Sequence, residues 1–330
     1  MSQLASNTSL SRSTRLLCYL GPPSAVLVTY YVSPKAGILS PIIFLPTALI
    51  LTKWRDSNRK NPLRRGELEP MIWTGVAAAT IGISFAALFQ LGVCKAASTL
   101  IFGSGDTEKF FWAQFQRNTI AGLTGDQIMR RLELANSWKS WLFNCILSYV
   151  GAGFTEEMLK YLPVIYASHR GTIKDRNSRN RAYIDYVLAA ALGYSVSEGV
   201  AYLYAVCESG QMNKSLILLT LFERLILGFV GHLSYACLTA IRATRRDYYG
   251  ERLRWWQVVG PSALLHGTWD MAALSISALN GNVGWIHPTG FWPTTAIIVP
   301  ATGIAAATVW QVIQELNALD ALDSVEKKSD

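Results

Sequence analysis

A series of apolar stretches, each about as long as a membrane-crossing helix, runs through this sequence and is separated by polar connections. A bilayer's hydrocarbon core requires about 20 apolar helical residues per crossing. Only 16% of the 330 residues are charged and 51% are hydrophobic, which excludes a disordered chain or a large soluble domain. We therefore predict an all-α, polytopic transmembrane helix bundle of about eight spans, at residues 16–32, 37–52, 71–94, 141–166, 182–206, 214–241, 255–279 and 291–314.

The distribution of basic residues predicts how the chain is oriented. Alternate connections carry 20 Lys and Arg residues on one side and 8 on the other. Because basic connections remain in the cytosol, both termini are predicted to be cytosolic. The net charge of +8 does not indicate a nucleic-acid partner, since the basic residues form short clusters between apolar stretches. The expected surroundings are a lipid bilayer.

Three regions follow from this pattern. Residues 1–140 hold the first spans and a long non-cytosolic connection, in which FFWAQFQ at 110–116 predicts an interfacial helix. Residues 141–280 form a four-span core that carries the ionisable residues. Residues 281–330 hold the last span and an acidic cytosolic tail.

Ionisable residues within the four core stretches indicate a functional site, because each costs about 3 kcal/mol or more at the bilayer centre. At ~1.5 Å per residue, the Glu156–Glu157 pair, His232 and His266 lie about 14 to 17 Å from the cytosolic ends of their helices, and Glu198 and Asp270 about 23 to 24 Å. We predict that they form one polar layer. The ionisable residues that we single out in these stretches are Glu156, Glu157, Lys160, Glu198, Glu223, Arg224, His232, His266 and Asp270.

Helical spacing adds local pairs to this layer. Lys160 follows Glu156 by four residues and Glu157 by three, so the ammonium can neutralise part of the carboxylate pair. Asp270 follows His266 by four residues and is expected to accept a hydrogen bond from the imidazole. For Arg224, pairing with a carboxylate across helices is the simplest expectation.

Two kinds of chemistry suit such a layer. A glutamate in a dry cavity can take a proton from water while an imidazole donates to the oxyanion, an interaction worth about 3 kcal/mol per donor. Alternatively, His232, His266 and either Glu157 or Glu198 could bind a divalent metal such as zinc, whose water is the nucleophile. The spacing does not choose between them, because the groups come from different helices.

The order of these motifs resembles the PrsW family of intramembrane proteases, which shares a superfamily with the CAAX prenyl endopeptidases. The resemblance covers about residues 150–275. The first motif is EExxK, formed here by Glu156, Glu157 and Lys160, and the second is an aromatic residue followed four positions later by Glu, formed by Tyr194 and Glu198. A span with an inward histidine, His232, comes next, and HxxxD, formed by His266 and Asp270, comes last. Tyr194 stands where Phe is expected, which keeps the ring and adds a hydroxyl.

The resemblance implies a hydrolase, an intramembrane endopeptidase that cleaves a membrane-associated protein. It implies that Glu156 and Glu157 activate water, that Glu198 assists, and that His232 and His266 stabilise the oxyanion or bind metal. Two other classes stay open. A proton-coupled transporter also uses chains of carboxylates and histidines, although no inverted repeat is evident, and a catalytically silent membrane scaffold would keep only the packing residues.

Overall fold

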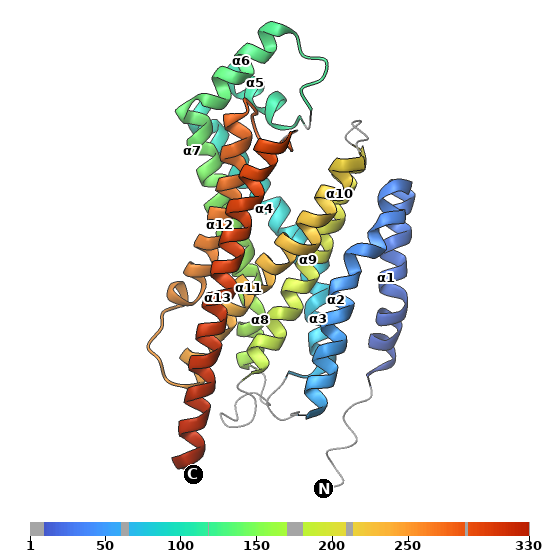
Figure 1. The fold of residues 1–330 in the computed structure, drawn as a ribbon, viewed down its shortest axis with the longest axis vertical. Helices are drawn as coiled ribbons and strands as arrows, with labels where there is room; N and C mark the ends of the chain where they lie inside the picture. The colour runs from blue at the N-terminus through green and yellow to red at the C-terminus, as the bar shows by residue number, and fades with distance from the viewer. Residues whose placement is uncertain are drawn as a thin grey trace. The chain divides into compact units, whose positions relative to one another are not determined.

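The computed structural model describes residues 10–60, 66–117, 119–169, 181–208, 214–287 and 290–329, and within these ranges it contains helices and loops but no strand. The all-α prediction is confirmed (Figure 1). In chain order the elements are α1 (Arg12–Val32), α2 (Pro34–Lys60), α3 (Leu68–Ala77), η2 (Ala78–Gly82), α4 (Ile83–Phe102), α5 (Asp106–Phe115), α6 (Gly125–Asn136), α7 (Trp138–Ile146), η3 (Leu147–Phe154), α8 (Thr155–His169), α9 (Ala182–Glu208), α10 (Lys214–Phe222), η5 (Glu223–Gly228), α11 (Phe229–Tyr248), α12 (Trp255–Leu279) and α13 (Phe291–Ser329).

The chain forms two compact units that alternate along the sequence. Unit 1 consists of Met1–Ile83, Leu162–Leu233 and Ala243–Glu251, and unit 2 consists of Ser84–Tyr161, Ser234–Arg242 and Arg252–Asp330. Helices α8 and α11 each contribute residues to both units.

In unit 1, the first two helices form a hairpin with only Ser33 between them (Figure 1). Four prolines lie inside these two helices, and neither helix ends at a proline. Helix α9 packs against α2, α3 and η2. The buried carboxylate of Asp185 secures this packing, since it accepts from Trp54 Nε1 at 2.9 Å and from the Gly66 amide at 2.7 Å.

In unit 2, α12 packs along η3 and also contacts α7 and α13. Two glycines allow the first of these contacts. A Cβ atom at Gly153 would lie 2.5 Å from the Ala263 carbonyl oxygen and 2.8 Å from the Gly267 amide nitrogen. Backbones can approach this closely in a membrane helix pair only where side chains are small.

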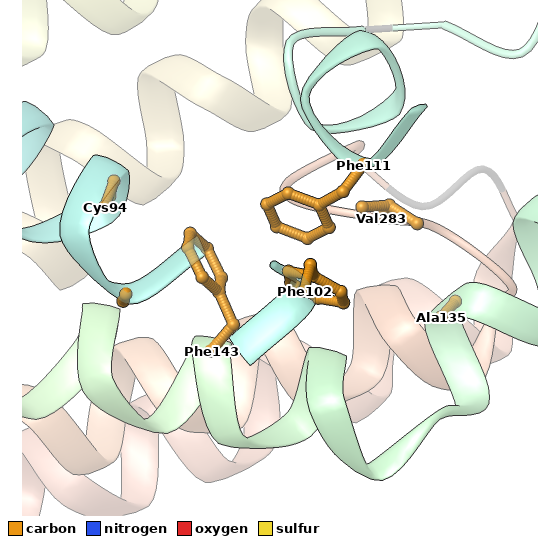
Figure 2. Packing of buried hydrophobic residues seen from close by; sticks show 7 residues of the cluster. Cys94, Phe102, Phe111, Ala135, Phe143 and Val283 are labelled. Atoms are coloured by element: carbon orange, nitrogen blue, oxygen red, sulfur yellow. The ribbon is translucent and has the colours of Figure 1, made fainter. Parts of the chain in front are cut away.

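A second core in unit 2 joins α4, α5, α6, α7 and the segment after α12. Phe111 is 1% exposed, and its ring centroid lies 4.3 Å from that of Phe102 and 4.7 Å from that of Phe143 (Figure 2). Trp112 and Phe115 pack against the same cluster. The aromatic residues of the 110–116 segment therefore contribute to a protein core, and the interfacial position of this helix stays a prediction.

Four helical segments among the described residues are long and apolar enough to cross a membrane: Pro34–Trp54, Leu68–Phe102, Lys214–Tyr248 and Phe291–Ser324. They coincide with four of the stretches that we predicted as spans. The other four stretches also form helices, in α1, in η3 with α8, in α9 and in α12, but their sequences are more polar. Eight spans are therefore not confirmed.

Candidate functional site

The first group of candidate residues lies in unit 2, where α8 begins directly after the π-helix η3. Glu156 and Glu157 occupy the first turn of α8, and Lys160 lies one turn further on. The Thr155 hydroxyl donates to the Val150 carbonyl at 2.8 Å, five residues back, which satisfies a carbonyl of the π-helical segment. π-helical segments occur frequently at functional sites, because the extra residue re-aims the side chains that follow.

Glu157 is the centre of this group. Its side chain is fully buried, and Oε1 accepts from Lys160 Nζ at 2.7 Å and lies 2.9 Å from His266 Nδ1. Because the carboxylate oxygen can only accept, Nδ1 of His266 carries the proton and donates. A carboxylate that receives Nδ1–H fixes the tautomer of a histidine and leaves Nε2 to bind another group.

Glu156 is held differently from its neighbour. Its Oε1 accepts from Gln90 Nε2 in α4 at 3.1 Å. Its Oε2 is buried without a hydrogen-bond partner among the described residues, and lies 3.8 Å from both Lys160 Nζ and His266 Nε2. This oxygen of Glu156 and Nε2 of His266 thus lie near each other.

Asp270 does not make the hydrogen bond that we expected. Its Oδ2 lies 3.7 Å from His266 Nε2, which is longer than a hydrogen bond, while Glu157 takes the proton of the other ring nitrogen. The spacing of HxxxD does place the two side chains on one helix face. The partner that orients the imidazole comes instead from another helix, which sequence spacing cannot show.

The second group of candidate residues lies in unit 1. His232 Nε2 and Glu198 Oε2 are 2.5 Å apart, and Arg224 Nη1 lies 3.3 Å from Glu198 Oε1. The Arg224 guanidinium also stacks over the ring of Tyr202, 3.5 Å from its centroid. The predicted pairing of Arg224 with a carboxylate on another helix is therefore present, and Glu198 holds a cation and an imidazole at once.

Tyr194 packs against the π-helix η2 in unit 1. It is 1% exposed, and its ring packs against Gly82 of η2, where an added Cβ would lie 3.2 Å from Cε2. A small residue at 82 leaves room for this ring. The contact explains why an aromatic side chain suits position 194.

Residues that sequence reasoning missed complete both groups. Gln90 contacts Glu156, Tyr202 contacts Arg224, and the ring of Tyr235 stacks on that of His266. A signal for Gln90 exists in the sequence, because an amide within the apolar stretch 71–94 is costly unless it is bonded. Tyrosines in apolar helices are too common to single out.

The donor atoms of unit 2 fit a divalent metal. Tetrahedral ligands at 2.0–2.2 Å from zinc lie about 3.3 to 3.6 Å apart. His266 Nε2 lies 3.8 Å from Glu156 Oε2 and 3.7 Å from Asp270 Oδ2, so small side-chain movements would suffice. The carboxylate on Nδ1 of His266 is the second-shell partner that metal-binding histidines usually have.

Two buried glutamates beside a histidine in an all-helical chain, with donor atoms spaced for a metal, are the groups that an intramembrane hydrolase needs. The family model of the PrsW family of intramembrane metalloproteases matches residues 70–300, well over half of the chain. The chain belongs to this family, which makes it an integral membrane protein and a peptidase. No curated protein and no solved structure matches it.

Proposed function

We propose that the protein is an endopeptidase that hydrolyses a peptide bond of a membrane-protein substrate within the bilayer, with water activated by a glutamate. The observation that carries this proposal is the buried contact of Glu157 with both Lys160 and His266, beside the free oxygen of Glu156. Adjacent buried carboxylates are a costly way to join helices, since a buried ion pair often contributes little net stability. Their retention inside a membrane segment favours chemistry.

In this proposal, Glu156 is the general base. Its Oε2 takes a proton from water as the water oxygen attacks the carbonyl carbon of the substrate, and the carbonyl electrons move to the oxygen. When the intermediate collapses, the C–N bond breaks and Glu156 returns the proton to the amine nitrogen. Gln90 keeps Oε1 occupied, so that only Oε2 accepts.

Glu157 and Lys160 orient the site rather than react. Glu157 holds His266 through Nδ1, and Lys160 balances the negative charge at a buried position. His266 then presents Nε2 toward Glu156 and the substrate. In the second group, we propose that Glu198 orients His232 while Arg224 fixes Glu198.

The family is one of metalloproteases, and we propose that His266 and Asp270, whose Nε2 and Oδ2 atoms lie 3.7 Å apart in unit 2, would help to hold the ion. A bound divalent metal would act as a Lewis acid that polarises the substrate carbonyl and acidifies water. The hydrogen bonds of Glu157 with Nδ1 of His266 and with Lys160 make it a weaker ligand candidate than Asp270. We further propose that residues 141–280 form the catalytic core and that both termini face the cytosol.

Substitution of the two glutamates tests this division of roles. The purified protein is incubated with single-span membrane proteins, and cleavage and bound metal are measured for wild type, Glu156→Gln and Glu157→Gln. If Glu156 is the base, Glu156→Gln loses at least about 10²-fold in kcat but keeps its metal, because an amide cannot accept the proton. Glu157→Gln is expected to lose both activity and about 10- to 100-fold in metal affinity.

The outcomes separate the alternatives. Equal cleavage by all three proteins would remove the catalytic assignment. Loss of metal in Glu156→Gln would make Glu156 a ligand and leave the base to another carboxylate. Proton-driven flux in proteoliposomes that the same substitutions abolish, without any cleavage, would favour a transporter.

A further inference from the structure

Tyr235 lies in the first group although no catalytic motif includes it. It belongs to α11, is 2% exposed, and stacks on His266 with ring centroids 5.4 Å apart and planes at 19°. The stack fixes the plane of both rings. Tyr235 is therefore a direct neighbour of the His266 imidazole at the site.

The backbone that carries this ring is also fixed. The Tyr235 carbonyl accepts from the Ser262 hydroxyl at 2.9 Å, and Ser262 accepts from Thr239 at 2.8 Å. All three residues lie in unit 2, and Ser262 is on α12, one turn before His266. These hydrogen bonds between α11 and α12 therefore fix the position of Tyr235 along the helix relative to His266.

The phenol oxygen, in contrast, is buried without a hydrogen-bond partner among the described residues. A buried polar atom that is left unpaired costs free energy and requires an explanation, such as a catalytic role. Stacking does not explain it, because a phenylalanine would stack equally well without the unpaired hydroxyl. The ring that carries this hydroxyl stacks on His266, whose Nδ1 lies 2.9 Å from Glu157 Oε1, so Tyr235 belongs to the same buried cluster of side chains.

We propose that Tyr235 is a further catalytic residue whose hydroxyl donates a hydrogen bond to the oxyanion of the tetrahedral intermediate. This inference rests on the proposed peptidase function. As the water oxygen bonds to the carbonyl carbon, the carbonyl oxygen gains the electron pair, and the phenol O–H points to it. No proton leaves Tyr235, and the interaction ends when the C–N bond breaks and the carbonyl forms again.

The chemistry of the hydroxyl suits this task. A phenol is a neutral donor, so it adds no charge to a layer that already holds carboxylates and a lysine. A donor that is unpaired in the resting site and paired in the transition state contributes differential binding, which is the condition for catalysis. The rigid stack on His266 supplies the preorganisation that such a donor needs.

Replacement by phenylalanine is the direct test. Tyr235→Phe keeps the ring and removes one oxygen, and loss of a single oxyanion donor typically lowers kcat by about 10²- to 10³-fold. We expect that loss with KM changed less than about twofold. The affinity for a phosphinate peptide that mimics the tetrahedral intermediate should fall by the same factor as kcat. The melting temperature and the bound metal should match those of wild type, because no contact of the folded protein is lost.

Tyr186→Phe is the matched control. Tyr186 is also fully buried, but its hydroxyl accepts from the Glu67 amide at 3.3 Å in unit 1. It should keep wild-type kcat and wild-type phosphinate affinity. Wild-type kcat in Tyr235→Phe, in a preparation in which Glu157→Gln is inactive, would overturn the role of Tyr235 and leave the peptidase proposal intact. Activity retained by Glu157→Gln would instead overturn the function on which the inference rests.

Discussion

Lys160 is the buried cation of the site in unit 2. It is fully buried, and its ammonium lies 2.7 Å from Glu157 Oε1 and 3.8 Å from Glu156 Oε2. We expect Lys160→Met to lower the free energy of unfolding by about 3–5 kcal/mol, because it leaves buried carboxylates without their cation. Thermal unfolding in detergent measures this change.

The control for Lys160→Met is Lys109→Met. The side chain of Lys109 is 82% exposed and lies 3.6 Å from Asp106, which is also exposed. Exposed ion pairs contribute about 0–1 kcal/mol, so this variant should unfold close to wild type. Equal destabilisation by the two substitutions would show that the buried position of Lys160 has no special energetic role.

Gln90 is the residue through which α4 acts on the site. Its amide occupies Glu156 Oε1, so Gln90→Leu should let the carboxylate rotate and pair with other donors. We expect kcat to fall about 10- to 100-fold, the usual effect of losing an outer-shell partner, with little change in melting temperature. Steady-state cleavage kinetics check this result, and Gln116→Leu, at an exposed position at the end of α5, serves as the matched control.

The sequence contained part of this site and not the rest, for a physical reason. Glu157, Lys160 and His266 could be predicted because charged and imidazole groups are expensive in a membrane helix and therefore stand out. The bond between Glu157 and His266 could not, since it joins residues 109 positions apart. Gln90 left only the signal of a single amide in an apolar stretch, and Tyr235 left none, because tyrosines are common in apolar helices.

At the scale of elements, the contact between η3 and α12 brings Glu157 and His266 together. An added methyl group at Gly153 would lie 2.5 Å from the Ala263 carbonyl, and backbone cannot yield as a side chain can. We expect Gly153→Ala to separate the helices, to lower kcat more than tenfold, and to lower the melting temperature. Gly260→Ala in α12 is the control, because a Cβ there meets nothing within 4 Å. It should be neutral or stabilising by about 0.5–1 kcal/mol.

The contact between α4 and α5 predicts a dependence on pH. Glu108 accepts from Lys95 at 2.7 Å, from Thr99 at 2.8 Å and from Ser98 at 3.0 Å. The hydrogen bond from Lys95, followed by that from Thr99, lowers the pKa of Glu108 to about 2, from an ordinary value of 4.5. A lowered pKa means that the carboxylate stabilises the fold above the unfolded pKa and that this contribution disappears as the pH falls through the folded pKa.

Glu108→Gln should therefore melt below wild type at pH 7, and the difference should shrink as the pH falls from about 5 towards 2. Melting curves at pH 7, 4.5 and 3 follow this change. Asp106→Asn is the control, since the Asp106 side chain is fully exposed and should give a constant, small difference. A difference for Glu108→Gln that is equally large at all three pH values would contradict the assigned carboxylate role.

Element boundaries show where hydropathy stops being informative. Most of the helices coincide with predicted apolar stretches, because apolar length is what a membrane helix requires. The prolines do not end α1 or α2, because backbone groups that a proline leaves without a hydrogen bond in a membrane helix can be satisfied by neighbouring groups. The π-helical segments η2, η3 and η5 leave no mark in an apolar pattern, because one extra residue changes the register without changing the hydropathy.

Across the fold, ionisable site residues lower the mean hydropathy of some helices and not of others. The helices that carry Glu156, Glu157, Glu198, His266 and Asp270 are less apolar than the four clear membrane segments, whereas Arg224 and His232 lie within one of those four, Lys214–Tyr248. Hydropathy therefore does not separate the helices of the site from the rest. The predicted eight crossings therefore have to be established by topology mapping rather than by hydropathy.

Topology mapping tests the predicted orientation directly. The asymmetry of 20 against 8 basic residues predicts that both termini are cytosolic and that the connection around Gly122, between α5 and α6, is on the opposite side. A glycosylation acceptor sequence inserted at Gly122, in eukaryotic microsomes, should be modified and should shift the mobility of the protein on a gel. The same sequence appended after residue 330 should remain unmodified. Modification at the terminus and not at Gly122 would show that the orientation is the reverse of the predicted one. Modification at both positions would place both on the same side of the membrane. The chain would then cross the membrane an even number of times after Gly122, and not the predicted odd number.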